Sequence, residues 1–306
     1  EQKKENVSLI NGNWIQSDEC YSPNKDFIRV MNSIYNSKIS YVNFTEMKDS
    51  IILDINHWVS EKTNSLISDM ISDEDIRLST VQVIINALYF YDEWNEAFNP
   101  SQTVENMFYS NFKDSVNVKM LTNTSYYNHF KDDLIHLLEI PYKDRETSFL
   151  VLLPNKNNID DILSHLDIET ILRYIENSEY EKGNIKIPKF TSQSSYSLKN
   201  HLINMGMISP FNPRSADFSG FWDYDNYCQK TPPKHYIDII KHKSVFKIDE
   251  IGTEATSATS VIINRVTMVD PMVQSFSFIA NKPFIYMIYN KKQNAILFTG
   301  IYKNPN

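Results

Sequence analysis

Glycine is scarce in this sequence, with six residues among 306. The phosphate-binding loops of nucleotide-dependent enzymes are rich in glycine, and neither a Walker pattern nor a dinucleotide fingerprint occurs here. There is also no G-x-S-x-G, no H-E-x-x-H and no cysteine beside a partner motif, so the common hydrolase signatures are missing. His129, His136 and His165 do not have the spacing of a metal cluster. We therefore expect no enzyme, no bound metal and no cofactor.

Positive charge is also in the minority. The sequence has 30 Lys and Arg against 38 Asp and Glu, a net charge of −8, so we expect no nucleic-acid partner. No apolar run approaches the length that spans a membrane, and we expect no membrane partner. The first five residues, Glu1 to Glu5, are charged and polar, so no signal peptide is visible.

Only two cysteines are present, Cys20 and Cys228. Two isolated cysteines are more often separate thiols than a disulfide, and we expect thiols here, with one bridge as the open alternative. Three sequons, at Asn6, Asn43 and Asn123, are candidate glycosylation sites and favour secretion. An extracellular location is therefore expected, and a cytoplasmic one is the alternative.

Hydrophobic residues make up 42% of the chain, which suffices for a large core. No repeat or low-complexity linker divides residues 1–306, so a single domain is expected. Helical spacing of apolar residues predicts helices at 54–71 and 159–175, a short one at 197–205 and one around 27–35. Apolar, β-branched runs predict strands at 7–15, 80–91, 184–190, 236–248, 284–289 and 295–302, and a pair of strands within 137–154. Because both faces of 80–91 are apolar, this strand should be central in a sheet, and the mixed order indicates an α+β fold.

One segment combines properties that rarely occur together. From Gly252 to Ser260 the side chains are small apart from Glu254, which is typical of an exposed loop. Its Thr residues and the following Val-Ile-Ile nevertheless favour a strand. In a strand, the face that begins with Thr253 would carry no charge, so the loop could enter a sheet and cover a core. Composition alone also fits an ordinary Ser/Thr-rich loop.

Several blocks, in order along the chain, resemble the serpin (serine protease inhibitor) family. They are His242 to Ala255, Asn86-Ala87-Leu88-Tyr89-Phe90 with Trp94 and Phe98-Asn99-Pro100, Glu139-Ile140-Pro141-Tyr142, Ile187-Pro188-Lys189-Phe190, Asn281-Lys282-Pro283-Phe284 and Leu297-Phe298-Thr299-Gly300. Each block is short, but together and in this order they are specific. The resemblance implies a serpin-like α+β fold, with a large central mixed or antiparallel sheet, further sheets, flanking helices and an exposed reactive-centre loop at about 252–280.

The resemblance also implies a mechanical inhibitor. A target protease attacks the loop and forms an acyl-enzyme, and the cut loop then enters the sheet as a new strand and distorts the protease. The hinge of this movement would consist of Glu250, Gly252, Thr253, Glu254, Ala255, Thr256, Ser257 and Ala258. In the family, a pair of residues that Asn86 and His242 match helps to hold the central strands together, in the region called the shutter. Trp94 matches a family tryptophan at the point where insertion begins.

The scissile bond stays open between three candidates. Counting forward from the hinge gives Val266-Thr267, beside Arg265, which suits a trypsin-like protease. Counting back from Asn281 gives Met272-Val273, which suits an elastase- or chymotrypsin-like enzyme. Asp270 would suit a caspase-like cysteine protease.

The expected partner is a serine protease, with a cysteine protease as the alternative, and the inhibitor should be a monomer. Family members carry several helices before the region matched here, so the chain is expected to be either a fragment or a serpin with a shortened N-terminus. A viral or parasite source is also expected. The competing function is that of a non-inhibitory serpin, acting as a carrier, chaperone or storage protein.

Overall fold

The computed structural model describes residues 7–18, 20–110, 114–155, 159–223, 234–253 and 276–305, without the Asp161 side chain. The chain divides into two compact units. The first consists of residues 1–90 with 192–246, and the second of residues 91–191 with 247–306.

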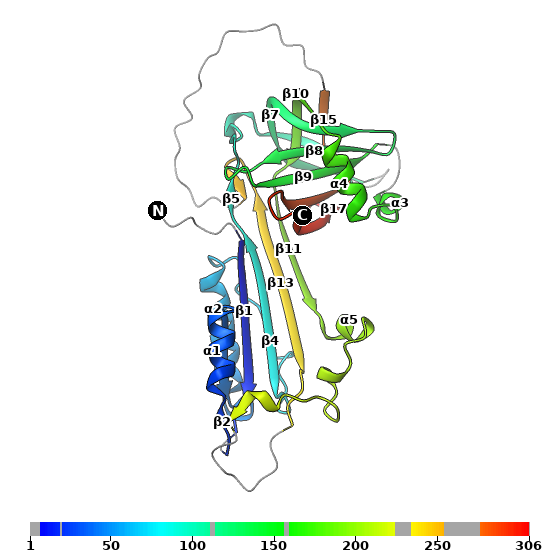
Figure 1. Ribbon diagram of the computed structural model, residues 1–306. Helices are drawn as coiled ribbons and strands as arrows, with labels where there is room; N and C mark the ends of the chain where they lie inside the picture. The colour runs from blue at the N-terminus through cyan, green and yellow to red at the C-terminus, as the bar shows by residue number, and fades with distance from the viewer. Residues whose placement is uncertain are drawn as a thin grey trace. The chain divides into compact units, whose positions relative to one another are not determined.

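The first unit contains a large mixed sheet with β4 (Gln82–Phe90) at its centre (Figure 1). On one side β4 pairs antiparallel with β1 (Val7–Gln16), which pairs parallel with β3 (Ser37–Val42). On the other side β4 pairs parallel with β13 (Ile239–Ile248), to which β11 (Phe190–Ser197) is paired. The prediction that the 80–91 strand is central and shares a sheet with the 236–248 strand is therefore confirmed.

Helix α2 (Phe44–Lys62) is the main helix of the first unit, and its bounds differ from the predicted 54–71. It begins ten residues earlier because the Asn43 side chain caps it, accepting hydrogen bonds from the backbone N–H groups of residues 45 and 46. It ends earlier because Asn64 and Ser65 adopt left-handed φ values of 49° and 64°. The apolar residues beyond position 65 continued the helical spacing without belonging to the helix.

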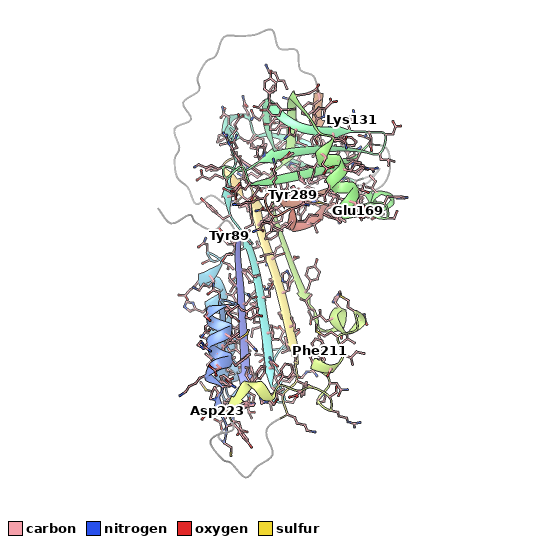
Figure 2. All side chains as sticks on the ribbon, in the orientation of Figure 1. Tyr89, Lys131, Glu169, Phe211, Asp223 and Tyr289 are labelled. Carbon is pink, nitrogen blue, oxygen red and sulfur yellow. The ribbon has the colours of Figure 1, made fainter. Side chains whose placement is uncertain are left out.

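The remaining elements of the first unit agree with the predictions where these were made. They are α1 (Lys25–Ser33), α5 (Lys199–Asn204), the short strands β2 (Ser22–Pro23) and β12 (Trp222–Asp223), and 3-10 turns at Ser209–Phe211 and Ser219–Phe221. Phe211, labelled in Figure 2, packs with Ile237 and Ile240 in one of the clusters of this unit's core.

The second unit is built on an eight-stranded sheet with the order β15-β10-β7-β8-β9-β16-β17, in which β6 also pairs with β7. Its strands are β6 (Val104–Tyr109), β7 (Ser115–Lys131), β8 (Ile135–Pro141), β9 (Thr147–Pro154), β10 (Glu179–Pro188), β15 (Phe276–Ile279), β16 (Phe284–Asn290) and β17 (Ala295–Tyr302). All neighbours are antiparallel except β10 and β15, which are parallel. The predicted strand pair within 137–154 is confirmed as β8 and β9.

The predicted helix at 159–175 is two helices, α3 (Ile159–Leu163) and α4 (Ile168–Glu176). The break occurs because Asp167 adopts an extended conformation and caps α4, with its carboxylate accepting from Thr170 N. Both helices cover a cluster of sheet residues that includes Tyr289, labelled in Figure 2. A 3-10 turn at Pro100–Gln102 completes the unit's helical elements among the described residues.

Cys20 is disulfide-bonded, so the expectation of a free thiol is wrong at this position. Cys228 lies outside the described residues. In the part of the chain that the structure describes, every helix is too short or too polar to cross a membrane.

Candidate functional site

The segment predicted to carry function begins within the described residues and continues beyond them. Glu250, Gly252 and Thr253 are described. The other hinge positions and every scissile-bond candidate lie outside the described residues: Glu254, Ala255, Thr256, Ser257, Ala258, Arg265, Val266, Thr267, Asp270, Met272 and Val273. The site that can be built is therefore the start of the hinge with its surroundings, and the shutter.

The hinge begins as a strand. After β13 the chain turns at residues 249–251, and β14 (Gly252–Thr253) pairs antiparallel with Ile248 on one side. On its other side β14 pairs antiparallel with β5 (Asp92–Glu93). Gly252 and Thr253 of the predicted hinge thus occupy a strand position between β13 and β5.

Gly252 is required by the close approach of β5. A Cβ atom at this position would lie 2.1 Å from the carbonyl oxygen of Asp92 and 2.6 Å from the Cα of Glu93. These are backbone atoms, so no side-chain rotation can make room. The hinge role of Gly252 stays a prediction. The structure requires glycine at this position for space beside a neighbouring strand and not for an unusual φ.

Thr253 is completely buried, and its hydroxyl makes a hydrogen bond of 2.7 Å with the hydroxyl of Tyr142. Burial raises the pKa of Tyr142 well above its ordinary value, with the bond to Thr253 acting against that rise. The phenol therefore stays neutral and can donate. Leaving the Tyr142 hydroxyl without a partner at this depth would cost about 1–3 kcal/mol. The pair therefore favours a side chain with a hydroxyl group at position 253.

Trp94 holds the turn that precedes the hinge. Its ring stacks on Tyr142 with centroids 4.7 Å apart and an interplanar angle of 9°, and its indole N–H donates to the carbonyl oxygen of Asp249 at 2.8 Å. The backbone N–H of Trp94 donates to Ile251 O at 2.8 Å. The Asp249 carboxylate in turn accepts from the backbone N–H groups of Ile251 and Gly252, at 3.0 and 3.3 Å. These contacts make Trp94 part of the turn before β14, and its role at the start of insertion stays a prediction.

Glu250 anchors the turn from its other side. Its carboxylate accepts from Lys189 Nζ at 2.6 Å and from the Thr103 hydroxyl at 2.9 Å. Burial opposes ionisation of this carboxyl group, but the hydrogen bonds from Lys189 and Thr103 outweigh it, and the pKa of Glu250 lies below its usual range. The carboxylate is therefore charged at neutral pH and holds the turn between β13 and β14 in place.

Asp92 is a buried carboxyl group on the strand that pairs with β14. Burial and the nearby Asp144 carboxylate raise the pKa of Asp92 from 3.8 to about 7. Only 7% of the residue is exposed, so solvent screens its charge weakly. At neutral pH, the strand that pairs with the hinge carries a carboxyl group which the fold prefers to keep protonated.

The contribution of Asp92 to the stability of the protein should therefore fall as pH rises from about 4 to about 7. Between the unfolded and folded pKa values the folded state binds more protons at Asp92, so the free energy of unfolding decreases with pH. Asp92→Asn removes this contribution and should stabilise the protein by about 2–4 kcal/mol above pH 7, while the smaller contribution of Asp238, whose pKa burial also raises, remains. Urea unfolding between pH 4.5 and 8 measures it, with Asp133→Asn, at an exposed position, as control. Parallel pH profiles for Asp92→Asn and the parent would contradict the assignment.

The shutter residues lie together in the first unit. His242 and Asn86 are register partners across β13 and β4, and His242 Nδ1 lies 2.5 Å from Asn86 Oδ1. The Asn86 side chain donates in turn to Asn11 on β1 at 2.7 Å. Burial lowers the pKa of His242, which favours the neutral ring with its N–H directed to Asn86. Three adjacent strands are thus joined by one row of side chains, in agreement with the predicted pairing of Asn86 and His242.

Two lysines tie β13 to the segment that follows α2. Lys243, with 7% of its side chain exposed, pairs with the Asp69 carboxylate at 3.0 Å and donates to the Asp69 carbonyl oxygen. Lys241 pairs with Asp75 at 2.6 Å, with both side chains 20% exposed. The Lys241–Asp75 pair is the better shielded of the two, whereas the Asp69 side chain is 75% exposed and its pair with Lys243 is open to screening by water and salt.

Several residues of the site were not expected from the sequence. Tyr142 and Lys189 belong to two of the short blocks that carried the family resemblance. The sequence therefore marked these residues but did not indicate what they contact. Asn11 and the hydroxyl pair Ser194–Ser244, at 2.7 Å between β11 and β13, had no signal at all. Their roles arise from strand register, which the sequence does not contain.

Two of the predicted sequons are described. Asn43 caps α2 through its side-chain oxygen, and Asn123 lies in β7, where its amide nitrogen donates to the Tyr127 hydroxyl at 3.0 Å. Asn6 lies outside the described residues. Glycosylation at these positions stays a prediction.

Comparison with known proteins decides the family. The model of the family described as "Serpin (serine protease inhibitor)" matches residues 1–305. The chain belongs to the serpin family. Curated relatives of this serpin include the leukocyte elastase inhibitor of Xenopus laevis, 30% identical over 306 residues, covering 98% of the chain and 77% of that protein. An uncharacterised serpin-like protein of Methanosarcina acetivorans is also 30% identical, over 98% of the chain and 67% of its own length.

Solved structures confirm the serpin fold. Native protease nexin-1 with heparin superposes with a TM-score of 0.83 at 22% identity, over 98% of this chain and 77% of that one. Uncleaved ovalbumin superposes with a TM-score of 0.82 at 23% identity, with the same coverage. The α+β serpin-like fold with a large mixed sheet is thus established.

Proposed function

We propose that this serpin is a suicide inhibitor of a serine protease, cleaved in the segment after Thr253 and acting by insertion of that segment into the central sheet. The observation that carries the proposal is the position of β14. Gly252 and Thr253 form the beginning of a strand, next to the end of β13. Over Ile239 to Val245, β13 is paired directly with β4. A strand that continues from Thr253 would have to part these two.

The composition of the segment supports the same proposal. The side chains that would follow Thr253 on its face of the strand are small or β-branched and uncharged, so they can be buried without an ion to desolvate. Insertion adds on the order of ten backbone hydrogen bonds, each worth roughly 1 kcal/mol net. The cleaved form should therefore be considerably more stable than the intact protein.

The target is proposed from the candidate bonds. Cleavage beside Arg265 would select a trypsin-like protease with an acidic specificity pocket, and we rank it above cleavage at Met272-Val273 and at Asp270. The disulfide at Cys20 supports a secreted protein, because disulfides persist in oxidising compartments. We propose a monomer that acts outside the cell without a cofactor and has no catalytic turnover of its own.

Incubation with a panel of trypsin-, elastase-, chymotrypsin- and papain-like proteases tests the proposal. The expected result is a covalent complex that survives SDS, with a released C-terminal fragment whose N-terminus identifies the scissile bond. The same proteases with their nucleophile removed are the control and should give no complex. Cleavage in the loop without complex formation by any protease would contradict inhibition and would favour a carrier, chaperone or storage role.

A further inference from the structure

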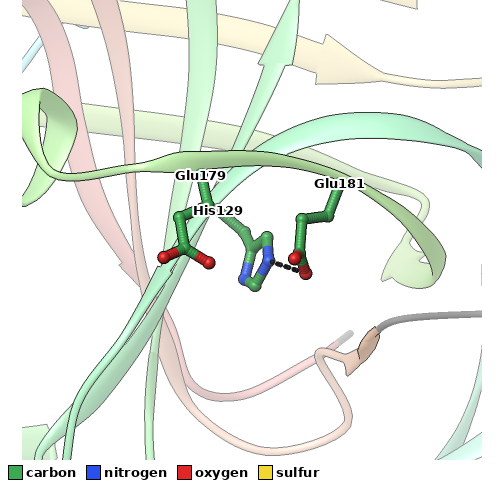
Figure 3. A group of neighbouring side chains, drawn as sticks. All are labelled: His129, Glu179 and Glu181. Carbon is green, nitrogen blue, oxygen red and sulfur yellow. Dashed lines mark hydrogen bonds and ion pairs between the residues drawn. The ribbon is translucent and has the colours of Figure 1, made fainter.

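A cluster of potential metal ligands lies on two neighbouring strands of the second unit, β7 and β10. His129 on β7 is the register partner of Glu179 on β10, and Glu181 follows two residues later on the same face of that strand. One ligand atom from each of the three residues lies within 4.8 Å of the other two. Figure 3 shows both carboxylates turned toward the imidazole. The sequence spacing of the histidines gave no reason to expect this group, because the pairing of strands creates it.

We propose that His129, Glu179 and Glu181 form a binding site for a divalent transition-metal ion of the zinc type. Imidazole nitrogen and carboxylate oxygen are the ligands that zinc takes together in proteins, and three protein ligands leave one position for water. Two carboxylates supply the negative charge that a dication requires, and the ion would relieve the repulsion between them.

The distances fit such an ion. His129 Nε2 lies 3.2 Å from a carboxylate oxygen of Glu181. With metal–ligand bonds of about 2.0–2.2 Å, the edge of a tetrahedral site measures about 3.3–3.6 Å. These two ligands are therefore already at bonding separation for one ion. Glu179 is exposed, so a change of side-chain torsion can bring its carboxylate the remaining distance.

The imidazole is held in place before any ion binds. The ring of Phe276 stacks on His129, with centroids 3.8 Å apart and an interplanar angle of 21°. Phe276 reaches it by lying over Gly183, where an added Cβ would be 2.2 Å from the phenyl ring. The other ring nitrogen of His129, Nδ1, lies 3.3 Å from Nε2 of His136 on β8. A partner on Nδ1 orients the ring and directs Nε2 to the carboxylates, as in many metal sites.

Titration calorimetry of the purified protein with zinc alone tests the site, and cobalt absorption in the visible range reports the ligand geometry. Glu179→Gln and Glu181→Gln should each weaken zinc binding by about tenfold or more, and His129→Gln should abolish it. Glu105→Gln, at an exposed position on β6, is the matched control for the loss of a carboxylate. His57→Gln is the control for adventitious binding, because His57 and Glu61 form an exposed pair at 3.4 Å.

Three results would overturn the proposal. They are no binding at millimolar zinc, binding that is lost in His57→Gln, and binding that is unchanged in both Glu179→Gln and Glu181→Gln. The two glutamate variants decide the matter even if His129→Gln fails to fold, because their side chains are less buried than that of His129.

Discussion

Thr253→Arg is expected to convert the protein from an inhibitor into a substrate. Position 253 is the first side chain on the face that must remain buried as the strand grows, and it is already inaccessible to solvent. An arginine there must lose its hydration, which costs several kcal/mol, and the buried carboxyl group of its register partner Asp92 would offset only part of that cost. Loop cleavage takes place farther along the chain and should proceed, but insertion would slow and the acyl-enzyme would hydrolyse. The expected products are cleaved serpin, little covalent complex and active protease.

Two conservative variants separate insertion from damage to the intact fold. Thr253→Ser keeps the hydroxyl that bonds to Tyr142, and it should inhibit like the parent. Thr253→Val keeps the shape but leaves the Tyr142 hydroxyl without this partner, which should cost about 1–3 kcal/mol of stability with inhibition retained. Thermal unfolding shows whether Thr253→Arg is folded before the protease is added. A folded Thr253→Arg protein that traps protease as well as the parent does would show that insertion does not proceed through this hinge.

Trp94→Ala is expected to have the largest effect on stability. The indole is 3% exposed, stacks on Tyr142 and meets the rings of Phe98 and Phe149 edge-on. Removing a buried tryptophan costs about 3–5 kcal/mol through lost contacts and the cavity left behind. The change also leaves the Asp249 carbonyl oxygen without its indole donor, so the turn before the hinge should loosen.

Urea unfolding followed by circular dichroism measures this loss without relying on tryptophan emission. Trp94→Phe is the matched control, because it keeps an aromatic ring for the stack but has no N–H. The lost hydrogen bond should lower the free energy of unfolding by about 1 kcal/mol, in addition to the loss from the smaller ring. Equal losses for Trp94→Phe and Trp94→Ala would mean that the hydrogen bond to Asp249, and not the packing, holds the turn. A loss below 1 kcal/mol for Trp94→Ala would contradict the assigned role.

Local patterns predicted the strands better than the helix ends. Strand β4 was predicted as central because both of its faces are apolar, and it lies between β1 and β13. The predicted range of helix α2 lay too far along the chain because the apolar spacing continues past Ser65. Its observed ends are set by the cap at Asn43 and by the left-handed residues after Lys62. Periodicity reports which side of a segment is buried, and capping decides where a helix stops.

Some residues of the candidate site could be predicted from the sequence, and others could not. Gly252, Thr253 and the pair Asn86–His242 could be predicted because the family resemblance places them on short stretches of sequence. The raised pKa of Asp92 could not be predicted, because it depends on burial and on a carboxylate 52 positions away at Asp144. Contacts made through strand pairing follow from register, which one sequence without relatives does not specify.

The lysine pairs on β13 have a consequence for the speed of the proposed insertion. Parting β13 from β4 moves Lys241 and Lys243 relative to the acidic segment at 69–75 that they bind. Part of the barrier to opening is therefore electrostatic, and dissolved salt lowers it without weakening the backbone ladder. Higher ionic strength should then make the sheet open sooner after the acyl-enzyme forms. A shorter delay leaves less time for the acyl-enzyme to hydrolyse, so a smaller fraction of the protease should escape.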